Sequence, residues 1–298
     1  MSNFKRLITI YVSTFFFGLI MTLALFTFIA IYITKDELVI NPGQSIEEEN
    51  GALGKIIKKA KASNLEISPP IIQSEEYVSN DVPPVYHFDK YQMTVIDITG
   101  QDMDYFYFKQ KPPKISSVAQ KNGCKIAVNA SYFAGNRQRA NHVGLLSILG
   151  KLHVPLGIER QLTHVAVFNR EGMSIEYFDV NNYKSNPTKS TLEFQTGPLV
   201  LDDGKVQSSF IKNSKNGMES HKRLLLATNK SNQTFLIVVR DRADLVELAS
   251  YLKGIDLFGK EPDVINLDGG SSVALWSKNN PEVNYNAGDT LPLVICVR

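Results

Sequence analysis

The chain lacks the short motifs that mark several enzyme classes. It has no Gly-x-Ser-x-Gly nucleophile elbow, no phosphate-binding P-loop, no Cys-x-x-Cys pair and no His-Glu-x-x-His zinc signature. His142, His153 and His164 recur at a regular interval. That spacing does not gather side chains in a strand-rich chain, so we expect surface or core histidines here. No metal site and no cofactor are predicted.

Cysteine is scarce. Cys124 and Cys296 are the two cysteines of the chain, which excludes a small fold held by a disulfide framework. Each stands beside an apolar stretch typical of a buried strand. Two buried free thiols are therefore the simplest expectation, and a single disulfide in an oxidising compartment stays open.

Neither sign of charge is in excess outside the N-terminus. Once Lys5 and Arg6 are set aside, the rest of the 32 basic residues balance the 30 acidic ones. A balanced surface has no general attraction for phosphate backbones, so binding to nucleic acid is not expected.

One long apolar run stands near the N-terminus. No residue from Leu7 to Ile33 is charged, and a helix needs about 20 apolar residues to cross a bilayer. A cleaved signal peptide has a shorter apolar core and a small-residue cleavage site, which this run lacks. The run predicts an uncleaved signal anchor, and Lys5 and Arg6 place the N-terminus in the cytoplasm by the positive-inside rule.

The chain after the anchor divides into a tether and a domain. Residues 35–84 carry an acidic run, a basic run and two Pro-Pro pairs, with little that could form a core. We therefore predict four parts: a cytoplasmic tail (1–6), a transmembrane signal anchor (7–34), a stalk (35–84) and one extracytoplasmic domain (85–298), either periplasmic or extracellular.

Short strand-like runs dominate residues 85–298, and helical patterns are few. Val, Ile, Phe and Tyr recur in short segments bounded by Gly, Asn or Asp. Two segments have helical character, Ile115–Lys121 and Asp241–Lys253, and Gly254 would end the second. The pattern predicts an α+β domain built around a mixed β-sheet.

The most informative segment runs from Asp263 to Trp276. An apolar strand brings Asp268 to its end, and Gly269, Gly270, Ser271 and Ser272 follow. Glycines let a ligand approach the backbone, and successive N–H groups in such a turn can bind an anion. A β-hairpin with an Asp-Gly turn is the simpler interpretation, but two glycines and two serines exceed what a tight turn needs.

Three further segments have similar character. The strand Ile126–Asn129 ends in Asn129, whose amide suits sugar hydroxyls or could cap a turn, and Tyr132 or Phe133 could stack on a sugar face. Gly197 lies in a Thr-Gly-Pro sequence. Arg223 enters a strand, where it could bind a phosphate or pair with a surface acid.

Taken in order, these four segments resemble the phosphodiester glycosidase family. The family pattern reads roughly Asn-Gly-Gly-Phe-Phe, Ser-Gly-Pro-x-Leu, Arg-Thr-Ala-x-Gly and Leu-Asp-Gly-Gly-x-Ser-Ser. This chain has Asn-Ala-Ser-Tyr-Phe, Thr-Gly-Pro-Leu-Val, Arg-Leu-Leu-Leu-Ala and Leu-Asp-Gly-Gly-Ser-Ser in the same order. The departures resemble a divergent bacterial-type member.

The resemblance implies hydrolysis of the bond between sugar C1 and a phosphate oxygen. It implies Asp268 as the carboxylate facing C1, Arg223 as a phosphate clamp and Asn129 as a sugar ligand. The remaining implied substrate-binding residues shape the site around them: Gly269, Gly270, Ser271, Ser272, Tyr132, Phe133 and Gly197. Asp203, Asp241 and Glu247 are candidates for a second carboxylate, although Asp241 could instead be the N-cap of the second helix.

The expected partners are a sugar-phosphodiester or glycan substrate and the membrane; protein partners are not predicted. Two other functions fit the sequence. One is a non-catalytic glycan-binding domain that assists exopolysaccharide or cell-wall assembly. The other is a membrane-tethered scaffold for protein partners.

Overall fold

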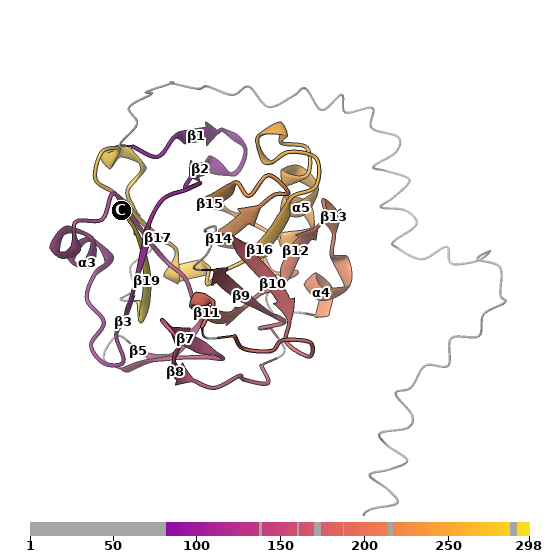
Figure 1. Cartoon of the computed structure of the whole chain (residues 1–298). Helices are drawn as coiled ribbons and strands as arrows, with labels where there is room; N and C mark the ends of the chain where they lie inside the picture. The colour runs from indigo at the N-terminus through magenta and orange to yellow at the C-terminus, as the bar shows by residue number, and fades with distance from the viewer. Residues whose placement is uncertain are drawn as a thin grey trace, which may run out of the picture. The chain divides into compact units, whose positions relative to one another are not determined.

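The computed structural model describes residues 82–136, 139–159, 161–169, 174–186, 188–213, 217–286 and 291–298 (Figure 1). The predicted tail (1–6), membrane anchor (7–34) and nearly all of the stalk (35–84) lie outside these residues. Within the described residues, no helix is both long and apolar enough to cross a membrane.

The described chain forms three large sheets and one two-stranded ribbon. The first sheet has the order β1 (Val85–Phe88), β2 (Met93–Asp97), β15 (Thr234–Ala243), β14 (His221–Thr228), β16 (Asp263–Asn266), β12 (Leu199–Asp202) and β13 (Lys205–Val206). The second sheet has the order β10 (Ile175–Asp179), β9 (His164–Asn169), β11 (Ser190–Thr196), β7 (Leu146–Ile148) and β8 (Lys151–Val154). The third sheet has the order β18 (Tyr285–Asn286), β17 (Ala274–Ser277), β4 (Ile126–Asn129), β19 (Leu293–Val297) and β3 (Met103–Tyr107), and the ribbon pairs β5 (Phe133–Asn136) with β6 (Arg139–His142).

The strand directions correct one prediction. Every strand pair among the described residues is antiparallel, so the sheets are not mixed. Hairpins need only short turns, whereas a parallel pair needs a long crossover, often a helix. With helices so few, antiparallel pairing follows. The mostly-β domain with helices on its outer faces is nevertheless consistent with the predicted α+β class.

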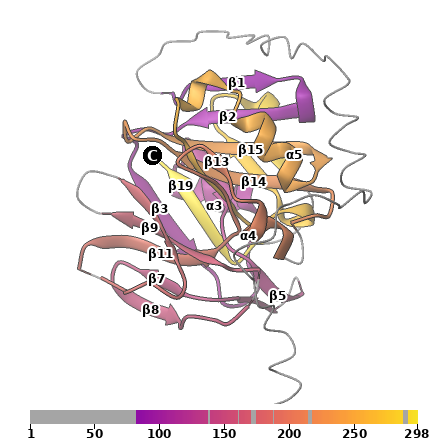
Figure 2. The same ribbon diagram turned by 90° about the vertical axis from the view of Figure 1, so that its right-hand side faces the viewer.

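The largest core lies where the inner faces of the three sheets meet. Successive side chains of a strand point to opposite faces, and one face of each sheet contributes apolar residues to this core. Representative members are Leu226 of β14, Phe194 of β11 and Val128 of β4, all fully buried. The three sheets therefore share one apolar core; Figure 2 shows how their ribbons are arranged.

Three short α-helices of the described chain cover outer faces. α4 (Ser208–Asn213) and α5 (Leu245–Leu252) lie beside the first sheet, and α3 (Ile115–Asn122) lies beside the third (Figure 1). Apolar residues of α5 form a second core with the outer face of the first sheet. α3 forms a third core with β4, β17 and β19.

The boundary of α5 corrects the helix predicted over Asp241–Lys253. The side chain of Asp244 accepts hydrogen bonds from the backbone N–H groups of Val246 and Glu247, so Asp244 is the N-cap. Asp241 belongs to β15, which pairs with β14 as far as Ala243. The residues from Asp241 to Ala243 thus belong to β15, although helical periodicity alone assigned them to the helix.

The cysteines correct a further prediction, since Cys124 and Cys296 are bonded rather than free. Cys124 follows the end of α3, and Cys296 lies in β19 opposite Ala127 of β4. Their Cα atoms are 5.4 Å apart, which is within the usual range for a disulfide. The bond joins the C-terminal strand to the segment that follows α3.

Candidate active site

Four segments far apart in the sequence meet where β16 ends. Beyond Asn266 the chain leaves the first sheet: the N–H of Leu267 still donates to Leu224 of β14 (2.8 Å), but that of Asp268 donates to Ala130 after β4 (3.2 Å). The backbone carbonyl of Asn266 accepts from the Thr196 hydroxyl (2.9 Å) and the Gly197 N–H (3.1 Å) after β11. All three sheets therefore contribute to one junction, and the four segments singled out in the sequence meet there.

Asn266 and Tyr132 tie these segments together. The Asn266 side-chain Nδ2 donates to the Tyr132 hydroxyl (2.6 Å), and that hydroxyl donates to the Gly197 carbonyl (3.0 Å). Gly197 precedes Pro198 in a cis peptide bond. Tyr132 thus acts as a polar bridge between the segments that follow β4, β11 and β16.

Asn129 holds both ends of the loop that contains Asp268. Its Nδ2 donates to the Asp268 carbonyl (2.8 Å), and its Oδ1 accepts from the Ala274 N–H (2.9 Å). The side chain is 1% exposed. The structure therefore gives Asn129 a positioning role for this loop.

The loop itself brings a carboxylate and a tight turn together. Asp268 is 8% exposed, and Gly270–Ser272 form one turn of 3-10 helix, η3. A Cβ atom at Gly269 would lie 2.7 Å from the Lys222 carbonyl oxygen, so only glycine permits this close approach to β14. At Gly270 φ is +63°, and a Cβ atom there would meet nothing within 4 Å. Open space therefore lies beside the predicted anion-binding turn.

Arg223 is fixed by the backbone at the start of β14. It is 2% exposed, its Nε donates to the Ala243 carbonyl (3.1 Å) and its Nη2 donates to the Glu219 carbonyl. Burial lowers the pKa of the guanidinium, while Tyr132, Asp244 and Glu219 raise it. An arginine keeps its charge in proteins, so a buried positive charge lies at this junction.

The electrostatics link Arg223, Asp268 and Tyr132. Burial raises the pKa of the Tyr132 hydroxyl, the charge of Asp268 raises it further, and the charge of Arg223 lowers it. Tyr132 thus remains protonated at neutral pH and keeps the hydrogen bond to Gly197. The site combines a carboxylate, a guanidinium and a neutral phenol.

Sequence reasoning missed two polar side chains at this junction. The Oγ of Ser131 and the Oδ1 of Asn266 are buried and have no hydrogen-bond partner among the described residues. Buried polar atoms normally have partners, so both atoms are suited to a ligand. The signal for Asn266 was visible in the sequence, because a lone Asn in a Val-Ile-Asn-Leu strand is costly to bury.

The candidate second carboxylates lie elsewhere. Asp203 follows β12, near the start of β16, where its N–H donates to Asp263 (2.7 Å) and its carboxylate pairs with Lys230. Glu247 is exposed on α5, near Lys90. Asp241 is exposed in β15, beside the irregular pairing of β15 with β14.

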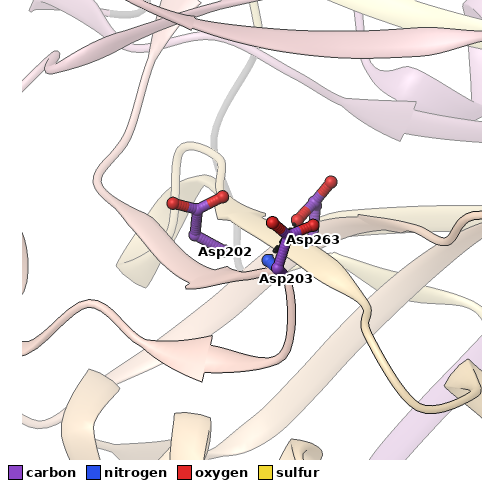
Figure 3. A group of neighbouring side chains, drawn as sticks. All are labelled: Asp202, Asp203 and Asp263. Carbon is purple, nitrogen blue, oxygen red and sulfur yellow. Dashed lines mark hydrogen bonds between the residues drawn. The ribbon is translucent and has the colours of Figure 1, made fainter.

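Asp202, Asp203 and Asp263 form one acidic cluster, called here the acidic triad (Figure 3). One oxygen from each lies within 4.8 Å of the others, which is the kind of geometry that can hold a cation. The hydrogen bond and charge of Lys230 lower the pKa of Asp203, whereas burial raises that of Asp263. Lys230 already pairs with one acid of this cluster. Exposed acidic groups are also common in proteins without a bound ion, so the cluster alone does not indicate a metal site.

Of the remaining predicted residues, the two serines stay in the Asp268 loop and Phe133 lies apart from it. Ser271 is exposed and Ser272 is buried within η3, whereas Phe133 packs against the core beside α3. Among the three histidines, His142 and His153 both face Tyr107, with ring centroids 6.3 Å and 5.3 Å from it. Within the described residues, the histidines belong to no group that could hold a metal ion.

Comparison with solved structures shows a shared fold. The catalytic domain of zebrafish N-acetylglucosamine-1-phosphodiester α-N-acetylglucosaminidase, auto-inhibited by its pro-peptide, matches with a TM-score of 0.53 and 14% identity; the match covers 72% of this chain and 77% of that one. A protein of Burkholderia pseudomallei described as exported matches with a TM-score of 0.50 and 9% identity, over 72% of this chain and 74% of that one. No curated protein sequence matches the chain significantly.

The sequence profile of phosphodiester glycosidases covers the whole of the candidate active site. It matches residues 122–298, which is more than half of the chain and includes all four segments that meet at the end of β16. The chain therefore belongs to the phosphodiester glycosidase family.

Proposed function

We propose that the protein is a membrane-anchored glycosidase that hydrolyses the sugar C1–O bond of a sugar-1-phosphodiester in an extracytoplasmic glycan or glycolipid. Membership of the family supports a hydrolase acting on phosphodiester glycosides. The observation that carries the proposal is the buried Asp268 carboxylate, held at the junction of three sheets beside Tyr132 and a buried arginine.

The chemistry suits one well-placed carboxylate. Cleavage breaks the bond between C1 and the phosphate oxygen; water supplies the new hydroxyl at C1, and a phosphate monoester leaves. A phosphate leaving group needs little protonation, so the chief demand is to stabilise the positive charge that develops at C1. Asp268 meets this demand as nucleophile, base or electrostatic partner.

The phosphate and the sugar need separate contacts. Arg223 supplies positive charge toward the phosphate, and the backbone of Gly269–Ser272 forms the anion-binding turn. Ser131 Oγ and Asn266 Oδ1, which have no partner among the described residues, take the sugar hydroxyls. In this proposal Asn129 acts through the loop it holds rather than through direct contact with the sugar.

Two observations support the extracytoplasmic location. The apolar run Leu7–Ile33 is long enough to anchor the chain, with the basic residues on its N-terminal side. The Cys124–Cys296 disulfide is of the kind that persists in oxidising compartments. The substrate would then lie at the outer face of the membrane.

The test is an assay of free sugar released by the full-length protein in detergent micelles. The substrates are an N-acetylglucosamine-1-phosphodiester and a panel of other sugar-1-phosphodiesters. Asp268→Asn removes the proposed carboxylate, and Asp263→Asn is the matched control at the other end of β16. We expect release that Asp268→Asn abolishes and Asp263→Asn preserves. Absence of release from every substrate by the folded protein would contradict the proposal and favour a non-catalytic glycan-binding domain.

A further inference from the structure

Exposed large apolar side chains of the domain are concentrated in one short segment. Among the described residues, five such side chains are exposed, and they belong to Leu149, Leu152, Leu156, Ile158 and Met218. Four of the five lie within residues 149–158, called here the apolar segment. Single exposed leucines are normal on a protein surface, whereas a concentration of them marks an interaction site.

The apolar segment occupies an outer edge of the second sheet. It comprises the turn of the β7–β8 hairpin, β8 itself and the start of the loop that follows. β8 is the last strand in the order of this sheet, and it lies at the lower margin of the domain in both views (Figure 1 and Figure 2). The Ile158 side chain is 97% exposed, so its burial contributes almost nothing to the stability of the fold. Its apolar surface is therefore available to a partner outside the chain.

Gln195 fixes the loop that carries two of these side chains. Gln195 is fully buried, its Oε1 accepts from the Gly157 N–H (2.8 Å), and its Nε2 donates to the carbonyls of Gly157 (3.0 Å) and Leu162 (2.9 Å). The loop backbone is thus held from the inside of the domain. Leu156 and Ile158, on either side of Gly157, nevertheless remain exposed. Their exposure is therefore a feature of a fixed loop.

The far end of this loop packs against the candidate active site. A Cβ atom at Gly197 would lie 2.8 Å from the Thr163 hydroxyl oxygen and 3.0 Å from the Thr163 backbone nitrogen, so the two backbones are in close contact. Gln195 precedes Gly197 at the end of β11. One short, fixed loop therefore joins the apolar segment to the Gly197 segment of the junction.

A lipid bilayer suits the apolar segment better than a protein partner does. Residues 149–158 contain no acid, and Lys151 is exposed among the apolar side chains, so the segment complements anionic headgroups and acyl chains. Lys151 in the edge strand β8 and Pro155 just after it oppose pairing with a further strand. Stable protein interfaces take about 20–30 residues a side, far more than four apolar side chains. A bilayer has no such requirement, because its surface needs no matching shape.

The predicted anchor keeps the domain within reach of a bilayer. The stalk predicted over residues 35–84 can span at most about 165 Å when fully extended. A tether of that length confines the domain near the membrane but does not select the face that the domain presents to it. Because a tethered domain has a high effective concentration at the membrane, a weak apolar contact is enough to select that face.

We propose that the apolar segment docks on the outer leaflet of the bilayer, with its four exposed apolar side chains inserted at the boundary between headgroups and acyl chains. The inference rests on the proposed membrane anchor and not on hydrolysis. It brings the loop that packs on Gly197 to the membrane surface. A lipid-linked sugar phosphodiester is then the substrate class that the domain is oriented to meet.

The test measures contact between the apolar segment and lipid. The full-length protein is reconstituted into vesicles of phosphatidylcholine and phosphatidylglycerol. Trp276 is the one tryptophan of the chain, so Ile158→Trp adds a single fluorophore within the segment. We expect lipids brominated on the acyl chains near the headgroup to quench this added emission. Ser231→Trp is the matched control, at an exposed position in the turn between β14 and β15, and its added emission should not be quenched.

A second pair of variants separates docking from any affinity of the introduced tryptophan for lipid. In the Ile158→Trp background, Leu152→Gln removes one apolar side chain from the segment and should lower the ratio of docked to undocked protein about tenfold. Met218→Gln removes the exposed apolar side chain that lies outside the segment and should leave quenching unchanged. Since both side chains are exposed, both variants should unfold at the same temperature as their parent.

An alkaline carbonate wash of the vesicles tests the anchor separately. If the protein is retained, three results would each overturn docking and leave the proposed hydrolysis untouched: Ile158→Trp without quenching, equal quenching of Ser231→Trp, or equal effects of Leu152→Gln and Met218→Gln. Extraction of the parent protein by carbonate would overturn the anchor and docking together. Sugar release from a water-soluble substrate does not depend on either result.

Discussion

The two ends of β16 place their carboxylates in different environments, and the comparison shows which environment suits a catalytic carboxylate. At one end, Asp263 belongs to the acidic triad, where Asp202 and Asp203 are exposed and Lys230 pairs with Asp203. Just past the other end, Asp268 is buried close to Tyr132 and Arg223. The charges of the two exposed acids are largely screened by water, and a lysine pairs with one of them. The charge of Asp268 lies in a buried, polar junction, where it is screened much less.

The paired substitution Asp268→Asn and Asp263→Asn tests this contrast most severely. Each change removes one negative charge with almost no change of shape. We expect Asp268→Asn to lower kcat/KM for sugar release by about a thousand-fold or more, in the range of a lost acid–base or nucleophilic group. Asp263→Asn should stay within about twofold. Comparable losses in the two variants would contradict the assignment of the site to the Asp268 end.

Removal of the disulfide tests whether stability alone could produce such a difference. The bond closes a loop over a sequence separation of 172 residues, and loss of a native disulfide typically costs about 2–5 kcal/mol. We expect the double variant Cys124→Ser, Cys296→Ser to lose stability in this range in denaturant titrations. The ratio of activities between Asp263→Asn and Asp268→Asn should persist in that background. If the two variants had similar activities in that background, the difference between them would reflect stability and not chemistry.

A pH titration tests the buried histidine that belongs to neither end of β16. Burial lowers the pKa of His142 to about 4, while its Nδ1 contacts the Gly144 carbonyl (3.1 Å). The unfolded chain, with a histidine pKa of about 6.5, therefore binds more protons between these values. Stability is fully present above pH 6.5 and falls as the pH drops toward 4.

The size of the His142 effect follows from the same shift. The loss is at most about 3 kcal/mol at pH 4, because one pKa unit corresponds to about 1.4 kcal/mol. The free energy of unfolding, measured in urea at pH 7 and at pH 4, should depend less on pH in His142→Phe. His153→Gln is the control at an exposed histidine facing the same tyrosine, Tyr107. An unchanged pH dependence in His142→Phe would show that carboxylates alone cause the acid loss.

Sequence reasoning identified the segments that meet at the candidate site more readily than the contacts between them. The order of four segments indicated one shared site, and the structure brings those segments together at the end of β16. The bridge from Asn266 through Tyr132 to Gly197 was not predicted, because it depends on which strand ends are neighbours. Periodicity reports which face a residue occupies and not what lies opposite it.

The same limit explains the corrected predictions. Cys124 and Cys296 are bonded because β19 pairs with β4, and that pairing brings the segment after α3 next to the C-terminal strand. Asp241 has helical spacing to the residues after it, but the β14–β15 ladder extends to Ala243 and leaves Asp244 as the cap. Long-range pairing overrides local propensity in both places. The predicted membrane anchor and most of the stalk lie outside the described residues and stay predictions.

The smallest expected difference is between two variants that each remove a hydrogen-bonding group, one at the Asp268 junction and one at the acidic triad. Tyr132→Phe removes the hydroxyl that accepts from Asn266 and donates to Gly197, yet Asn266 Nδ2 also contacts the Gly197 and Leu267 carbonyls. The junction should therefore persist, with a stability loss of about 1 kcal/mol and a fall of about tenfold in kcat/KM. Lys230→Met removes the partner of Asp203 in the acidic triad and should leave kcat/KM unchanged. If Lys230→Met were the more damaging change, the acidic triad rather than the Asp268 junction would be the functional end of β16.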